Sequence, residues 1–138
     1  MRLAAQGMKN LGLEFDAILS SPYLRARQTA EIVAQIYNLK SKKIHLTDNL
    51  LPPASIEKLL KEARSVFPGS KSILLVGHEP HLTQMVSSLL KCDGPLNLDF
   101  KKGGLCCLSV SLPLDKSGAV FNWLLTPTQL GLISPKEK

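Results

Sequence analysis

The sequence has few cysteines, and their spacing does not link them. The three thiols, Cys92, Cys106 and Cys107, are odd in number and include no C-x-x-C pair, which indicates neither a disulfide framework nor a zinc site. Cys106 and Cys107 are neighbours in a strand-like run, so their side chains should point to opposite faces. We expect packing residues here, not a redox pair. This cysteine usage favours a reducing, cytoplasmic setting.

Long apolar runs and acidic residues are also scarce. No run approaches the roughly 18 apolar residues of a membrane span, and the N-terminus lacks the apolar core of a signal peptide, so we expect no membrane partner. Lys and Arg outnumber Asp and Glu by 17 to 11, which gives a net charge of +6. Because no aromatic residues interleave with the basic ones, nucleic acid is a poor candidate partner. The surplus of basic over acidic residues indicates either a solvated basic surface or attraction to acidic, phosphorylated partners.

Helical and strand-like patterns alternate along the chain. We expect helices at residues 3–11, 22–37, 56–66 and 80–90, and strands at 15–20, 43–46, 73–77, 105–112 and 120–125. A loop at 49–55 and turns at 93–95 and 115–118 separate some of them. The pattern predicts a single α/β domain over residues 1–138, with a mostly parallel sheet and helices on both faces. The last two strands have no helix between them and should pair antiparallel at one edge.

Two strand–helix junctions carry the residues best suited to chemistry. In residues 73–80 (ILLVGHEP), an apolar strand ends at Gly77 and His78. In residues 17–30 (AILSSPYLRARQTA), a strand runs into a helix whose first turn holds Arg25. Ligands of open α/β sheets bind at the carboxyl ends of the strands, and a helix that begins there offers N–H groups to an anion. We predict that Arg25 and His78 share a phosphate pocket.

Each of these residues also has a simpler interpretation. Arg25 stands near a helix N-terminus, where partial positive charge disfavours a cation, and Arg27 precedes Glu31 in the less favourable order for a helical ion pair. A bound phosphate would explain this placement, but a solvated arginine pair is the alternative. His78 could be a half-buried packing residue. Gly77 and the helix-opening Pro80 favour the functional interpretation.

Other nucleophile patterns are absent. The sequence has no G-x-S-x-G elbow, P-loop or H-E-x-x-H motif, and it indicates no metal and no cofactor. Ser20 and Ser21 are interpreted as a strand end and a helix cap. His45 has no partner suggested by spacing, and His81 should lie exposed on the helix after His78. Three carboxylates stay open as proton donors: Asp48, Glu57 and Glu79.

The two junctions resemble motifs of a known family. Residues 20–30 (SSPYLRARQTA) are similar to the second-arginine motif of the histidine phosphatase superfamily, and residues 75–80 (LVGHEP) resemble its second-histidine motif. Residues 101–104 (KKGG) and 123–127 (WLLTP) are similar to the SixA-type phosphohistidine phosphatase branch. The resemblance runs from about residue 3 to residue 130. It implies a three-layer α/β/α fold like that of phosphoglycerate mutase.

The resemblance also implies roles for site residues. Arg25 and His78 would be catalytic residues that hold the phosphoryl oxygens. With N–H groups near Glu79, they would stabilise the charge of the transition state. Glu79 is therefore placed with Arg25 and His78 in the phosphate-binding set, and no metal is implied.

One family motif is absent. Members of the superfamily begin with a strand that ends in Arg-His-Gly, whose histidine is the nucleophile, and these 138 residues contain no such tripeptide. The sequence begins inside what resembles the first helix, so we expect the first, central strand beside the His78 strand to be missing. A start downstream of the true one, or a shortened chain, explains this better than a true loss, because the other site residues are intact. Such a chain should be inactive as given. Its two unpaired strand edges should destabilise it or make it pair with another chain as an oligomer.

We therefore expect a phosphohistidine phosphatase that acts on a histidine-phosphorylated signalling protein through a phosphohistidine enzyme intermediate. One alternative is a phosphatase for small phosphomonoesters, which should need a proton donor for its alkoxide leaving group. The other is a non-catalytic module that holds phosphate or a phosphoprotein.

Overall fold

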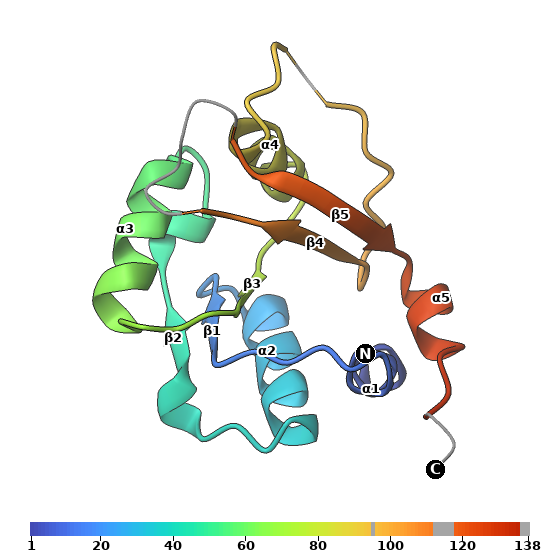
Figure 1. The fold of residues 1–138 in the computed structure, drawn as a ribbon. Helices are drawn as coiled ribbons and strands as arrows, with labels where there is room; N and C mark the ends of the chain where they lie inside the picture. The colour runs from blue at the N-terminus through green and yellow to red at the C-terminus, as the bar shows by residue number, and fades with distance from the viewer. Residues whose placement is uncertain (95, 112–117, 136–138) are drawn as a thin grey trace.

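The computed structural model describes residues 1–94, 96–111 and 118–135 (Figure 1). Its helices are α1 (Arg2–Asn10), α2 (Leu24–Ile36), α3 (Ile56–Val66), α4 (His81–Leu89) and α5 (Pro127–Gly131), with short 3-10 turns η1 (Ser41–Lys43) and η2 (Asp48–Leu50). Its strands are β1 (Ala17–Ser20), β2 (Ile44–Leu46), β3 (Ile73–Val76), β4 (Leu105–Ser109) and β5 (Val120–Leu125). In the described ranges, no helix has the length and apolar character needed to cross a bilayer.

The strands form two sheets. The first is parallel in the order β2-β1-β3, and β1 is its central strand. The second is the antiparallel pair of β4 and β5 (Figure 1). The predicted α/β class, the parallel sheet and the antiparallel pair are confirmed. Within the described residues, the pair forms a sheet of its own and does not hydrogen-bond to the edge of the first sheet.

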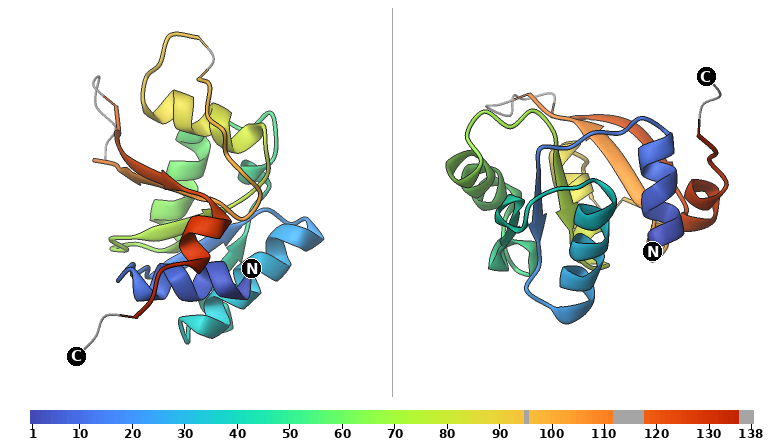
Figure 2. Two further views of the ribbon diagram at one scale, coloured as in Figure 1. Left: turned by 90° about the vertical axis from the view of Figure 1, so that its right-hand side faces the viewer. Right: turned by 90° about the horizontal axis from the view of Figure 1, so that it is seen from below.

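Helices cover both faces of the parallel sheet. Neighbouring residues of β1 point to opposite faces, so Ile18 packs into one core and Leu19 into another. The Ile18 core is built mainly from α1 and α2, and Leu130 of α5 joins it. The Leu19 core is built from α3 and α4. The right-hand view of Figure 2 shows α3 on one side of the strands and α1 and α2 on the other.

Most predicted elements are present, with ends that differ by a few residues. The exception at a functional position is the start of α2, which we expected at residue 22. Tyr23 still has an extended backbone conformation and is the N-cap, without a side-chain cap. Helix α5 was not predicted. Its signal is a capping box in which Thr126 and Gln129 satisfy each other's backbone N–H groups. The predicted turns at 93–95 and 115–118 fall partly outside the described residues.

The first and last helices pack against each other very closely (Figure 1). Gly7 of α1 lies against the backbone of α5, and a Cβ atom at Gly7 would stand 1.7 Å from the carbonyl oxygen of Leu130. The Asn10 side-chain amide donates a hydrogen bond to the carbonyl of Ile133 at 2.9 Å. These contacts hold the C-terminal segment on α1.

Candidate active site

Three parallel strands end at the same level of the sheet. Ser20 of β1 is paired with Leu46 of β2 and with Val76 of β3. The Ser21 N–H donates to the Val76 carbonyl, and the Thr47 N–H donates to the Ser20 carbonyl, both at 2.9 Å. The residues that follow each strand are thereby gathered at one edge, where open α/β sheets bind their ligands.

At this edge, His78 is held by Ser21. The Nε2 atom of His78 lies 2.6 Å from Ser21 Oγ, which also accepts the N–H of Tyr23 at 3.2 Å. The tyrosine ring packs on the imidazole, with centroids 5.1 Å apart. Ser21 can therefore donate its own proton to Nε2, an arrangement that leaves Nδ1 as the nitrogen available to a ligand. The interpretation of Ser21 as the cap of α2 was wrong, since its hydroxyl positions this histidine before the helix begins.

Arg25 is the second residue of α2 and is exposed. It lines the same cavity, of about 880 Å³, as His78 and Glu79. Within the part of the chain that the structure describes, its guanidinium has no hydrogen-bond or ion-pair partner, and the first turn of α2 holds no acidic residue. A free guanidinium beside an uncapped helix start is well suited to bind an oxyanion. Arg27 is exposed and does not line this cavity.

The other helix at this edge, α4, begins differently. Glu79 accepts the Thr83 N–H at 2.8 Å through Oε2 and the Thr83 hydroxyl through Oε1. The carboxylate thus occupies the first turn of α4, where negative charge is favourable. The structure places Arg25, His78 and Glu79 in one cavity, but the carboxyl oxygens of Glu79 already have donors. The predicted roles of these three residues remain predictions.

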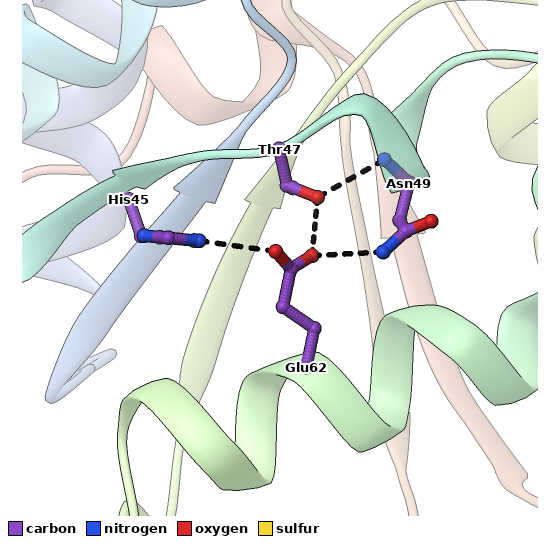
Figure 3. Close-up of polar contacts among 4 residues, drawn as sticks. All are labelled: His45, Thr47, Asn49 and Glu62. Atoms are coloured by element: carbon purple, nitrogen blue, oxygen red, sulfur yellow. Dashed lines mark hydrogen bonds and ion pairs between the residues drawn. The ribbon is translucent and has the colours of Figure 1, made fainter.

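A second polar cluster lies beside this edge, at the end of β2 (Figure 3). Glu62 of α3 lies 3.1 Å from His45 Nε2, accepts the side-chain amide of Asn49 at 3.0 Å, and also accepts the Thr47 hydroxyl. The backbone N–H of Asn49 donates to Thr47 Oγ1 at 3.0 Å. Spacing in the sequence suggested no partner for His45, and the structure places Glu62 of α3 against it. His45 and Thr47 share one face of an extended segment, which was the only sequence signal for the cluster.

The hydrogen bonds to Glu62 can be tested by the pH dependence of the protein's stability. Burial opposes its ionisation, but hydrogen bonds from Thr47, Asn49 and His45 outweigh it and hold the pKa of Glu62 below its ordinary value. A carboxylate with a lowered folded-state pKa stabilises the fold above its unfolded pKa of about 4.3, and this contribution disappears as pH falls through the folded pKa. We expect Glu62→Gln to lower the free energy of unfolding at neutral pH by about 1–3 kcal/mol.

The measurement is urea unfolding of both proteins between about pH 7 and pH 3. The two stabilities should converge at the acid end, because Glu62 is then protonated in the parent protein too. Glu31→Gln, at an exposed position of α2, serves as the control and should follow the parent curve. A Glu62→Gln deficit that stays constant with pH would contradict the assignment.

The remaining titratable residues are placed less favourably for catalysis. His81, which we expected to be exposed, is 5 % exposed, because it lies on the buried stripe of α4 with Met85 and Leu89. Asp48 and Glu57 are both exposed, and neither lines the cavity of Arg25 and His78. No group of three or more His, Cys, Asp or Glu residues in the described ranges could hold a metal ion.

All three cysteines are free thiols. Burial, with a smaller effect of the neighbouring Cys107, raises the pKa of Cys106 to about 11. Burial also raises the pKa of Cys107. Neither thiol is suited to act as a nucleophile at neutral pH.

The order of these features along the chain defines a class of protein. A strand followed by a helix bearing Arg25, and a later parallel strand followed by His78, meet at one sheet edge, which is the arrangement of the histidine phosphatase superfamily with its phosphoglycerate-mutase-like fold. Comparison with known proteins identifies the branch of this superfamily. No protein-family model matches the chain. The phosphohistidine phosphatase SixA of Escherichia coli (strain K12) is 32% identical over 136 residues, which cover 94% of this chain and 77% of SixA. The chain belongs to the SixA-type phosphohistidine phosphatases and is a hydrolase of that family.

Two further comparisons agree with this assignment. An uncharacterised protein of Picosynechococcus sp. is 35% identical over 138 residues, which cover 98% of this chain and 78% of that protein. The solved structure of the protein histidine phosphatase SixA complexed with tungstate superimposes with a TM-score of 0.76 at 26% identity. That match covers 94% of this chain and 80% of the other.

Proposed function

We propose that this protein is a phosphohistidine phosphatase that removes phosphate from a histidine-phosphorylated signalling protein through a phosphohistidine enzyme intermediate. The observation that carries the proposal is that Arg25, whose guanidinium has no partner among the described residues, and His78, held by Ser21, line one cavity at the carboxyl edge of the sheet. The SixA relative that binds tungstate, a tetrahedral oxyanion, is consistent with a phosphoryl group in this position.

The chemistry assigned to the site is electrostatic. Arg25 offers paired N–H donors to two phosphoryl oxygens, His78 offers Nδ1, and the uncapped first turn of α2 offers backbone N–H groups. N–H groups near Glu79 complete the set. Donors fixed in place before the reaction stabilise the charge that develops on the transferring group.

We further propose that the attacking histidine is not among these 138 residues. The sequence contains three histidines, none of them in an Arg-His-Gly tripeptide. His45 is engaged by Glu62, His81 is buried in α4, and Nε2 of His78 is engaged by Ser21. The alternative, a module that binds phosphate without hydrolysing it, rests on the same lack of a free nucleophilic histidine among these residues.

The surroundings of the cavity favour a protein substrate over a small phosphomonoester. Tyr23 is 58% and Leu24 63% exposed beside the site, and Lys101 and Lys102 line the cavity. Exposed apolar and basic side chains can contact an acidic phosphoprotein. A phosphohistidine P–N bond also makes little demand on a general acid, whereas a phosphomonoester needs a proton donor. Glu79, the acidic residue among those that line the cavity, is engaged by Thr83. The three free thiols favour a reducing, cytoplasmic setting.

The test compares the 138-residue chain with a form extended at its N-terminus by a strand segment ending in Arg-His-Gly. The substrates are a histidine-phosphorylated phosphotransfer domain and an aryl phosphate. We expect no phosphoenzyme burst and negligible turnover from the 138-residue chain, and recovery of phosphohistidine hydrolysis in the extended form.

The matched control carries Arg-Ala-Gly in place of Arg-His-Gly and should stay inactive. Robust turnover by the 138-residue chain would show that its nucleophile lies within it, and His81 would be the first residue to substitute. Tungstate binding without activity in any form would favour the binding module. Faster turnover of the aryl phosphate than of the phosphoprotein would favour the phosphomonoester alternative.

A further inference from the structure

Tyr23 is an exposed aromatic residue at the rim of the candidate active site. In the chain it lies between Ser21, which holds His78, and Arg25, which lines the same cavity as His78. Its ring packs on the His78 imidazole, with the ring centroids 5.1 Å apart and the two planes inclined by 44°. Tyr23 is nevertheless 58% exposed. The contact with His78 therefore leaves much of the tyrosine side chain open to another molecule.

Hydrogen bonds on both sides fix the backbone of Tyr23. Its N–H donates to Ser21 Oγ at 3.2 Å, and its carbonyl accepts the N–H of Arg27 at 3.0 Å. The packing of the ring on His78 restrains the side chain as well. A side chain that is held before a ligand arrives loses little conformational entropy when the ligand binds. Tyr23 is therefore a preorganised surface, although it is exposed.

The position of Tyr23 suits contact with the group that carries the phosphate. Tyr23 does not line the large cavity, whereas Arg25 and His78 do, so its ring stands beside the phosphate position and outside that cavity. The leaving group of a phosphorylated substrate is bonded directly to the phosphorus atom. When Arg25 and His78 hold the phosphoryl oxygens, the leaving group is therefore within reach of a ring that touches His78.

The chemistry of the ring selects among leaving groups. Aromatic rings favour offset or tilted contacts with centroids about 4.5–7 Å apart, and the contact between Tyr23 and His78 is of this kind. The tyrosine ring thus already packs on one imidazole. The leaving group of a phosphohistidine is a second imidazole, which can pack on the exposed part of the ring. A phosphorylated lysine or aspartate side chain offers no ring to it.

We propose that Tyr23 is a specificity-determining residue, whose exposed ring stacks on the imidazole of a substrate phosphohistidine while Arg25 and His78 hold the phosphoryl oxygens. This inference rests on the proposed function, and it names the feature by which the site selects phosphohistidine over phosphorylated side chains that lack a ring.

The test compares two ligands with the same P–N bond. N-phosphoimidazole carries the ring, phosphoramidate lacks it, and each is titrated against tungstate on the 138-residue protein. We expect N-phosphoimidazole to bind about three- to tenfold more tightly than phosphoramidate, the size of one stacking contact. Tyr23→Ala should abolish this preference, and Tyr23→Phe, which keeps the ring, should retain it. Leu46→Ala is the matched control, because Leu46 is a 45% exposed residue at the same edge of the sheet, and it should also retain the preference.

The outcomes separate this inference from the proposed function. An equal loss of affinity for both ligands in Tyr23→Ala would show that the ring only braces His78, and it would overturn the proposal. A preference that persists in Tyr23→Ala, or normal tungstate binding with no preference in the parent protein, would overturn it too and leave the phosphate site intact. If the parent protein bound neither tungstate nor phosphoramidate, the phosphate site itself would be refuted, and the role of Tyr23 with it.

Discussion

Arg25→Ala is expected to weaken tungstate binding by roughly 30- to 100-fold, whereas Arg27→Ala should leave it nearly unchanged. A hydrogen bond to a charged group contributes about 1.5–3 kcal/mol, and Arg25 can make two to one oxyanion. The guanidinium of Arg25 has no other partner in the described structure and lines the cavity of His78. Residues two apart in a helix point about 200° apart around its axis, so Arg27 points away from the cavity that Arg25 lines.

Isothermal titration at fixed ionic strength measures both affinities, because exposed charges are screened by salt. Arg25→Lys should recover little of the lost affinity, since an ammonium cannot reproduce the paired donors of a guanidinium. In a form that turns over phosphohistidine, kcat/KM should fall in the same order. A larger loss from Arg27→Ala than from Arg25→Ala, in binding or in turnover, would overturn the assignment of Arg25.

Gly7→Ala is expected to cause a large loss of stability, because Gly7 has the least room for a Cβ atom among the described glycines. The added methyl group would stand 1.7 Å from the Leu130 carbonyl oxygen, and this neighbour is backbone that cannot rotate away as a side chain can. Overpacking costs about 1–3 kcal/mol when neighbours can adjust, so we expect a loss of about 3 kcal/mol or more, measured by urea unfolding.

A matched control is Gly131→Ala in α5. Its added Cβ atom would meet only the Leu3 side chain, at 3.2 Å. Leu3 is 72% exposed and free to move, so the change should cost far less. If the loss of stability from Gly7→Ala were as small as that from Gly131→Ala, α1 and α5 could separate without consequence for the fold.

The sequence predicted those elements whose signals are local. Helix Ile56–Val66 and strand Val120–Leu125 have the expected bounds. The helix begins at a Ser55 cap and ends before a Pro-Gly pair. The short α5 was missed because its five residues show no helical periodicity. Its only signal was the pattern of Thr126 and Gln129.

The sequence indicated that Arg25 and His78 lie at one edge of the sheet, but it did not indicate which side chains bond to one another there. Arg25 and His78 could be brought together because parallel strands end at one edge. The bond between Ser21 and His78 joins residues 57 positions apart, and no spacing rule connects a serine beside a proline to a distant imidazole. Glu62 was overlooked for a similar reason. A carboxylate in the middle of an amphipathic helix resembles any solvated acid until the end of β2 is placed against it.

The contact between α1 and α5 bears on the order in which the chain folds. Asn10 and Ile133, which it joins, are separated by 123 positions in the sequence. Closing so long a loop costs conformational entropy before the contact can form and stabilise the chain. Such long-range contacts therefore tend to form after the contacts between residues close in sequence. We therefore expect the docking of α5 to follow the folding transition state. Weakening this contact should speed unfolding and leave the folding rate almost unchanged.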